Sequence, residues 1–382
     1  MVIIFVFLSI FIIQFVIALE MNFIGPLAPF LSNYFGIKGS QVILLNLGYS
    51  ISGIFVPFIG YLSDIYGKKK FMIIGLLSFI LGCFGCAYSL EAIYFSVSRI
   101  LIGLSYFTLM STMLSYLSDF IDYSNRAKAN GVMRFSFSLA ILLSPIYASY
   151  IVDKFGNLKY IYLPLAITAF IPIFILLFLP ESSKNNLSIL NAKNIIKVAT
   201  TKNSKIILFS LFLIISIPTL LYNYLGLHLT TNFNFLQSEV GRFYSFIAVG
   251  TIIGVVTSAI FSAKIGNLKY SKVFFFVLFI ALIPIGFTQN INLLMISSFL
   301  FAIGLDGGFS AYQTYITEIE KDMRGTFVSL IYTVNALTIT FYSLIGPKIY
   351  EAGGIKLIII LSLIFMIISI LLMSNLNDIR QD

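Results

Sequence analysis

The sequence predicts an all-α integral membrane protein with twelve transmembrane helices in two six-helix bundles, related by a pseudo-two-fold axis along the membrane normal. Its 382 residues are 59% hydrophobic and 10% charged, whereas about a quarter of the residues in a soluble domain are charged. Apolar runs of about twenty residues recur from end to end, and each is long enough to cross a hydrocarbon core of about 30 Å. Short stretches of the first half also return in the second half, as a duplicated bundle requires.

Hydropathy locates each span. The twelve predicted spans cover residues 4–30, 41–62, 71–90, 93–118, 132–152, 158–179, 206–227, 243–263, 272–288, 291–316, 327–347 and 355–374. The one long break, at residues 181–205, holds five lysines against a single acid, Glu181. We therefore predict an N-terminal six-helix bundle over residues 1–180, a cytoplasmic basic linker over 181–205 and a C-terminal six-helix bundle over 206–382.

The distribution of basic residues predicts the orientation. With the N-terminus in the cytoplasm, 17 of the 24 lysines and arginines fall in inside loops, 6 fall in outside loops, and Arg99 lies within a span. The positive-inside rule then predicts a multi-pass protein of the cell (plasma) membrane with both termini in the cytoplasm. The first apolar run lacks a basic start and a small-residue cleavage site, so we interpret it as a span rather than a signal peptide. Because the basic residues lie in these loops, the net charge of +9 does not call for a nucleic-acid partner.

Three short matches between the halves indicate an internal duplication. They pair residues 21–25 with 222–226 at an offset of 201, residues 40–42 with 238–240 at 198, and residues 144–145 with 346–347 at 202. Six spans per copy is an even number, so both copies enter the membrane from the same side and the repeats are parallel. Repeats of this kind place a solute site at their interface near the middle of the membrane.

The loop between the second and third spans carries the most specific motif. Residues 60–70 read Gly-Tyr-Leu-Ser-Asp-Ile-Tyr-Gly-Lys-Lys-Lys, which resembles the G-x-L-x-D-R-x-G-R-K loop of the major facilitator superfamily. Ile65 stands where the family has a basic residue. The resemblance implies that the loop is a conformational latch that holds the two halves in the outward-open state. The implied latch residues are Gly60, Asp64, Gly67 and Lys68; a purely topological turn is the alternative.

Other landmarks extend the resemblance over nearly the whole chain. Residues 99–103 look like the family's R-x-x-x-G segment, and residues 180–182 look like its P-E-[ST] sequence after span six. The fifth span follows the register of the G-x8-G-x3-G-P-x2-G-G signature of the twelve-span drug:proton antiporter branch, with small residues that suit close helix packing. The residues in that register are Gly131, Ala140, Ser144, Pro145, Ala148 and Ser149, of which Gly131 and Pro145 are literal matches.

Three ionisable residues lie well inside spans, where a charge costs about 3 kcal/mol or more. Glu20 lies about 16 Å and Arg99 about 9 Å below the outer ends of their spans, so a long arginine side chain can bridge the difference. The resemblance also implies that spans one and four both line the cavity. Burial disfavours the charge of a carboxylate and a nearby guanidinium favours it. We therefore predict that Glu20 and Arg99 form the proton-coupling pair, with Glu20 as the protonatable group. The alternative is a permanent ion pair that fixes helix packing.

The third charge, Asp306, lies about 22 Å below the outer end of its span and is flanked by glycines that allow a substrate or a backbone to approach closely. It is predicted to bind a cationic solute or a second proton, and a structural hydrogen bond is the alternative. Further polar and aromatic residues are predicted to face the same cleft, with ordinary interhelical hydrogen bonding as their alternative. They are Asn22, Asn46, Tyr106, Tyr222, Asn223, Tyr312 and Asn335.

These patterns together predict a secondary active transporter that works by alternating access. The resemblance implies proton-coupled efflux of a small lipophilic or cationic solute by a monomer in the lipid bilayer, without a cofactor and with the proton gradient as energy source. Uptake of a sugar, amino acid or organic anion, bound by Arg99, is the alternative. The lone C-x-x-C of Cys83 and Cys86 is interpreted as small apolar helix residues, not as a redox or metal site. With His228 as the single histidine and no phosphate-binding glycine loop, we expect neither an enzyme nor an ATP-driven pump.

Overall fold

The computed structural model describes residues 2–118, 120, 126–181, 200–319 and 324–377. Within these residues all regular structure is helical. The chain divides into two compact units, Met1–Leu190 and Asn191–Asp382, so the boundary between them falls within the predicted linker.

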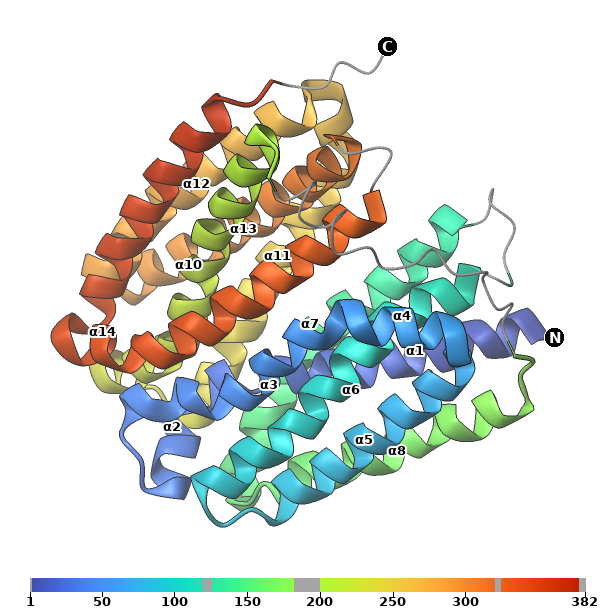
Figure 1. The fold of residues 1–382 in the computed structure, drawn as a ribbon. Coiled ribbons are helices and arrows are strands. Elements are labelled where there is room, and N and C mark those ends of the chain that lie inside the picture. The colour runs from blue at the N-terminus through green and yellow to red at the C-terminus, as the bar shows by residue number, and fades with distance from the viewer. Residues whose placement is uncertain (1, 119, 121–125, 182–199, 320–323, 378–382) are drawn as a thin grey trace. The chain divides into compact units, whose positions relative to one another are not determined.

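The first unit consists of helices that Figure 1 shows in blue to green. They are α1 (Val2–Met21), α2 (Ile24–Phe35), the 3₁₀ helix η1 (Gly39–Asn46), α3 (Leu47–Ser52), the 3₁₀ helix η2 (Gly53–Phe55), α4 (Val56–Tyr66), α5 (Lys68–Tyr88), α6 (Ala92–Ser118), α7 (Arg126–Phe155) and α8 (Lys159–Phe178). Within the unit α5 packs against α6 and α8, while α1 packs against α7 and α8.

The second unit contains fewer but longer helices. They are α10 (Lys202–Phe233), α11 (Gln237–Ile265), α12 (Asn267–Phe287), α13 (Ile291–Ile319) and α14 (Arg324–Ser374). Within α14, Gly354 has φ 60° and ψ −151°, so two helices meet there and the chain doubles back (Figure 1). The helices before and after Gly354 are the predicted spans eleven and twelve.

Ten helices in the described residues are long and apolar enough to cross a membrane. The long helix over Leu330–Ser374 is counted once although it holds two spans. The predicted second span, 41–62, does not form one helix, because it is divided among η1, α3, η2 and α4. When the helix over Leu330–Ser374 is counted as two spans and the divided segment 41–62 as one, the helices of the described residues correspond to the twelve predicted spans.

Two serine hydroxyls bond to backbone carbonyls within the second span. The Ser50 hydroxyl donates to the Leu47 carbonyl at 3.0 Å, and the Ser52 hydroxyl donates to the carbonyls of Gly48 at 3.0 Å and Ile100 at 3.1 Å. The last of these bonds connects the span to α6. The hydropathy pattern records only how apolar the segment is, so it predicted one continuous helix.

The duplication is visible in the backbone of both units. Gly67 joins α4 to α5 with φ 107° and ψ 127°, and Gly266 joins α11 to α12 with φ 97° and ψ 123°. Both are left-handed conformations that glycine adopts without strain. Asn22 and Asn223 also match, since each side-chain amide donates to the carbonyl four residues earlier, at 2.7 and 2.6 Å.

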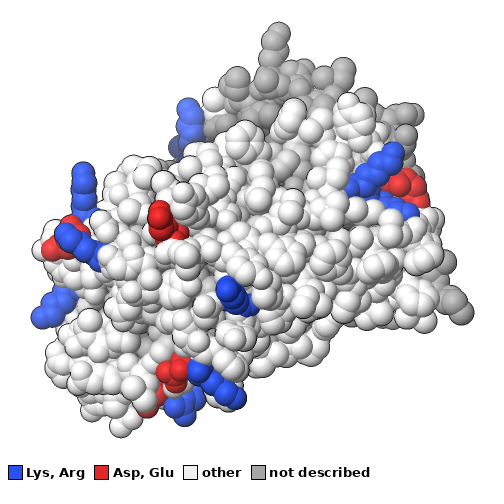
Figure 2. Space-filling model, turned by 90° about the horizontal axis from the view of Figure 1, so that it is seen from below, with Lys and Arg blue, Asp and Glu red and all other residues white. Residues whose placement is uncertain are grey.

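The outer faces of the helices are apolar, as α8 illustrates. Ile167, Phe170, Phe174 and Phe178 recur every three or four residues and are exposed, while Leu165 and other residues of the opposite face are buried. On the face that Figure 2 shows, the charged side chains of the described residues lie at a few places, and most of the described surface between them is uncharged. Exposed apolar stripes of this kind suit a lipid environment rather than water.

Candidate functional site

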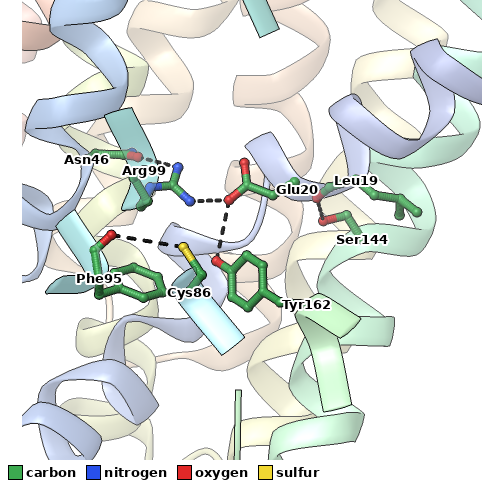
Figure 3. Close-up of polar contacts among 8 residues, drawn as sticks. All are labelled: Leu19, Glu20, Asn46, Cys86, Phe95, Arg99, Ser144 and Tyr162. Carbon is green, nitrogen blue, oxygen red and sulfur yellow. Dashed lines mark hydrogen bonds and ion pairs between the residues drawn. The ribbon is translucent and has the colours of Figure 1, made fainter. Parts of the chain in front are cut away.

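The two buried charges of the first unit are in direct contact. Glu20 near the end of α1 and Arg99 on α6 are both 0% exposed and form an ion pair in which Arg99 Nη1 donates to Glu20 Oε1. Arg99 Nη2 donates to Asn46 Oδ1 at 2.6 Å, and the Tyr162 hydroxyl on α8 donates to Glu20 Oε1 at 3.4 Å. We call Glu20, Asn46, Arg99 and Tyr162 the Glu20 cluster (Figure 3). The sequence argument from depth predicted the contact between the two charges, and it missed Tyr162.

Aromatic rings enclose the guanidinium. The Arg99 Cζ lies 5.0 Å from the ring centre of Tyr49 and 6.0 Å from that of Phe95. Such contacts stabilise a desolvated cation by about 2 kcal/mol or more. Phe23 packs edge-on against Tyr162 with ring centres 6.0 Å apart. The residues of the Glu20 cluster and the two rings beside Arg99 therefore come from five elements of the first unit, which are α1, η1, α3, α6 and α8.

The cluster keeps unused hydrogen-bonding capacity. Glu20 Oε2 and Arg99 Nε are buried without a partner among the described residues. A buried ion pair whose remaining polar atoms are unsatisfied is poor at stabilising a fold, because desolvation offsets most of the attraction between the charges. Glu20 Oε2 is free to accept a proton or a hydrogen bond.

The span-five residues of the sequence analysis lie along the contact between α7 and α1. Ala140, Ser144, Pro145, Ala148 and Ser149 are buried. Two hydroxyls cross the contact, because Ser136 donates to the Phe11 carbonyl at 2.8 Å and Ser144 donates to the Leu19 carbonyl at 2.6 Å. Sequence reasoning considered only the small size of these residues and missed the hydrogen bonds.

The loop between α4 and α5 packs on the end of α8. A Cβ atom on Gly67 would lie 2.5 Å from a Glu181 carboxylate oxygen. Lys69 Nζ donates to the carbonyls of Leu177 at 3.2 Å and Leu179 at 2.6 Å, where a cation favourably meets a helix C-terminus. These contacts lie within the first unit.

The remaining latch residues are described only in part. Lys68 is buried, whereas the surroundings of Gly60 and Asp64, and those of Gly131 in the span-five signature, lie outside what the structure describes. The role of the loop in holding the two halves together stays a prediction.

In the second unit, Asp306 on α13 accepts a hydrogen bond from the Thr251 hydroxyl on α11 at 2.7 Å. The glycines beside it serve close helix packing. A Cβ on Gly304 would meet the backbone of α12 at 2.7 Å, and one on Gly254 would meet the backbone of α13 at 2.7 Å. The approach of a neighbouring backbone, one of the two roles expected for glycines around Asp306, is therefore present in the structure, and the approach of a substrate stays a prediction.

Tyr244 on α11 inserts its hydroxyl into the hydrogen-bond ladder of α10. The hydroxyl donates to the Tyr222 carbonyl at 2.5 Å and accepts from the Gly226 amide at 3.1 Å. These two backbone groups are four residues apart and would otherwise pair with each other in a regular helix. Inserted side chains mark points where helices bend. No feature of the sequence singled out Tyr244.

The other predicted cavity residues differ in exposure. Tyr312 is fully buried and its hydroxyl pairs with that of Ser210 at 2.7 Å, so it belongs to the packing of its unit. Asn335 and Tyr106 are half-buried, and Tyr106 packs against Tyr49 with ring centres 5.6 Å apart. Asn22, Asn46, Tyr222 and Asn223 are also half-buried.

The two cysteines lie beside the Glu20 cluster in the first unit. Cys83 and Cys86 on α5 are buried free thiols. The Cys86 thiol lies 3.9 Å from the carbonyl of Phe95, a long contact to a weak donor. Both side chains therefore behave as small apolar residues between helices.

Comparison with known proteins relates the chain to membrane carriers. The sequence profile of the Major Facilitator Superfamily matches residues 10–288 and again residues 207–377. Multidrug resistance protein 1 of Bacillus subtilis is 23% identical over 352 residues, which cover 88% of this chain and 87% of that protein. A protein of Buchnera aphidicola, known as an uncharacterized transporter, is 30% identical over 230 residues, or 59% of this chain and 56% of that protein. The chain thus spans about half the length of that relative.

Among solved structures, a D-xylose-proton symporter is 15% identical, with a TM-score of 0.80 over 98% of each chain. At this identity the likeness shows the fold, which is the twelve-helix, two-bundle fold of a multi-pass membrane transporter.

Proposed function

Because the chain belongs to the Major Facilitator Superfamily, we propose that it is a plasma-membrane antiporter that exports a small lipophilic or cationic solute in exchange for protons. The observation that carries the proposal is the buried contact between Glu20 and Arg99. The similarity to a multidrug resistance protein over most of both chains supports the direction of transport and the class of solute.

Glu20 is the proton carrier in this proposal. Arg99 cannot lose its own proton in a useful pH range, so it acts as a fixed charge. While Arg99 Nη1 contacts Glu20 Oε1, the carboxylate stays charged; when a helix movement separates them, burial favours the protonated acid. Glu20 lies one residue before the end of α1, where the first span breaks before α2 begins at Ile24.

Asp306 is the proposed contact for a cationic solute. Its carboxylate is held by Thr251, and Tyr244 lies seven residues before Thr251 on the same face of α11. Tyr222 packs against Tyr244 and Phe301 with ring centres 6.3 and 5.7 Å away. A carboxylate near aromatic faces suits lipophilic cations.

The arrangement of Arg99 weighs against anion uptake. Both terminal nitrogens of its guanidinium are engaged, one with Glu20 and one with Asn46, and the side chain is 0% exposed. An anion would have to displace the carboxylate of Glu20 before it could bind there.

The test uses purified protein in sealed vesicles with an imposed pH gradient, acidic inside. We expect tetraphenylphosphonium to enter as protons leave, and Glu20→Gln to abolish the solute-dependent proton flux. Glu91→Gln removes an exposed carboxylate and serves as the matched control. Proton-driven transport that persists in Glu20→Gln would refute the coupling role, and transport of a sugar or organic anion in place of the cation would refute the solute class.

A further inference from the structure

Two serines of α7 contact α1 in the same register. Ser136 donates to the Phe11 carbonyl and Ser144 to the Leu19 carbonyl, and each pair is separated by 125 residues in the chain. The two helices therefore run in the same direction, with Ala140 buried between the two contacts. The hydrogen bonds are chemically alike, but they meet α1 at different places.

The carbonyl of Leu19 belongs to the end of a helix. α1 ends at Met21, where the last carbonyls of a helix lose their partners four residues on. The Asn22 amide reaches the Leu19 carbonyl at 3.3 Å, whereas the Phe23 amide turns to the Glu20 carbonyl at 3.2 Å. The Ser144 hydroxyl, at 2.6 Å, therefore supplies the shorter bond to Leu19. Phe11 lies well inside α1, so Ser136 adds a bond where the helix already provides one.

The carbonyl that Ser144 contacts belongs to the residue before Glu20, the proposed proton carrier. Because the carbonyl of Leu19 and the amide nitrogen of Glu20 form one planar peptide unit, a bond that fixes this carbonyl also fixes the backbone of Glu20. Ser144 thus holds the plane from which the Glu20 side chain departs towards Arg99 and Tyr162 (Figure 3).

We propose that Ser144 is a positioning residue that keeps Glu20 in contact with Arg99. The inference rests on the proposed function, in which Glu20 carries the coupling proton. In the drug:proton antiporter signature the residue before the proline is glycine, which has no hydroxyl; Ser144 in this chain supplies the bond. Ser144→Ala removes the bond and keeps a small side chain, and Ser136→Ala is its matched control two turns away.

The experiment measures the protonation of Glu20 itself. The full chain is reconstituted in lipid, and the infrared band of protonated carboxyl groups is recorded against pH; the part absent in Glu20→Gln belongs to Glu20. We expect Ser144→Ala to move the midpoint of that titration to higher pH by about one unit, because a loosened contact with Arg99 stabilises the carboxylate less. Ser136→Ala is expected to leave the midpoint in place. Thermal stability is measured in parallel for both.

The outcomes separate this inference from the function on which it rests. Equal midpoints in Ser144→Ala and Ser136→Ala, whether both shifted or both unchanged, would overturn the positioning role and leave Glu20 as the proton carrier. A loss of thermal stability in Ser144→Ala with an unchanged midpoint would do the same. If no band of the unaltered protein disappears in Glu20→Gln at any pH, Glu20 does not titrate, and the proposed function and the inference both fail.

Discussion

Removal of Arg99 alone tests how the buried pair contributes to stability. In Arg99→Met the carboxylate of Glu20 loses its counter-charge, and the described donor that remains is the Tyr162 hydroxyl at 3.4 Å. That distance exceeds the range of about 2.5–3.0 Å in which hydroxyl bonds are strong. Loss of one partner from a buried ion pair costs about 3–5 kcal/mol. We expect this loss in the free energy of unfolding at alkaline pH.

The loss of stability in Arg99→Met should depend on pH, because Glu20 becomes neutral when it binds a proton and then needs no counter-charge. In Arg99→Met the folded state then binds a proton more readily than the unfolded state, so stability rises as the pH falls. The gain is about 1.4 kcal/mol for each pH unit over which Glu20 is protonated in the folded state alone. The double variant Glu20→Gln, Arg99→Met carries no buried charge in the cluster, so its stability should recover most of the loss and lose the pH dependence.

Equilibrium unfolding in mixed micelles with sodium dodecyl sulfate, followed by circular dichroism, measures these free energies. The two single variants and the double variant form a double-mutant cycle with the unaltered protein. If the two single effects add up in the double variant, or if the stability of Arg99→Met is independent of pH, the charges do not interact as the structure indicates and the reasoning is wrong.

Three further variants test other contacts. Tyr162→Phe removes a donor to Glu20, so the pH profile of transport should shift to higher pH, whereas Tyr147→Phe, whose hydroxyl contacts backbone carbonyls of α8, should leave it unchanged. Thr251→Val removes the described donor to Asp306, so tetraphenylphosphonium transport should fall several-fold while the amount of folded protein holds; unaltered transport would argue against Asp306 as a solute contact. Gly67→Ala places a Cβ on a residue with φ 107°, a conformation that residues other than glycine rarely adopt, and should lower stability by about 1–3 kcal/mol in the unfolding assay; an unchanged midpoint would contradict a strained backbone at this turn.

The sequence was sufficient for most of the spans and for the charged pair, because both depend on strong penalties. A charge in the membrane must find a partner, so depth along two helices, together with the family resemblance that lets both helices line one cavity, predicted the contact of Glu20 with Arg99. Uncharged polar residues carry no comparable penalty. Tyr162, Thr251 and Ser144 therefore look like many other hydroxyl-bearing residues of the chain, and their partners became apparent only from the structure.

The broken second span was missed for a related reason. Hydropathy averages over a window and registers only how apolar a segment is. The 3₁₀ turns at Gly39–Asn46 and Gly53–Phe55 change the path of the helix without changing that average. The glycines around Asp306 left two roles open, because a missing side chain admits a substrate and a neighbouring backbone equally well.

The duplication supplies an argument about the buried charges that neither half supplies alone. Asn22 and Asn223 make the same bond to their own helices at an offset of 201 residues, so the two segments are equivalent. At this offset Leu221 stands in place of Glu20 and is buried. The second copy thus builds the same stretch of helix with an apolar residue, and the fold does not need a carboxylate there. A costly charge kept in one copy and absent from the other is better explained by a task in transport than by a requirement of folding.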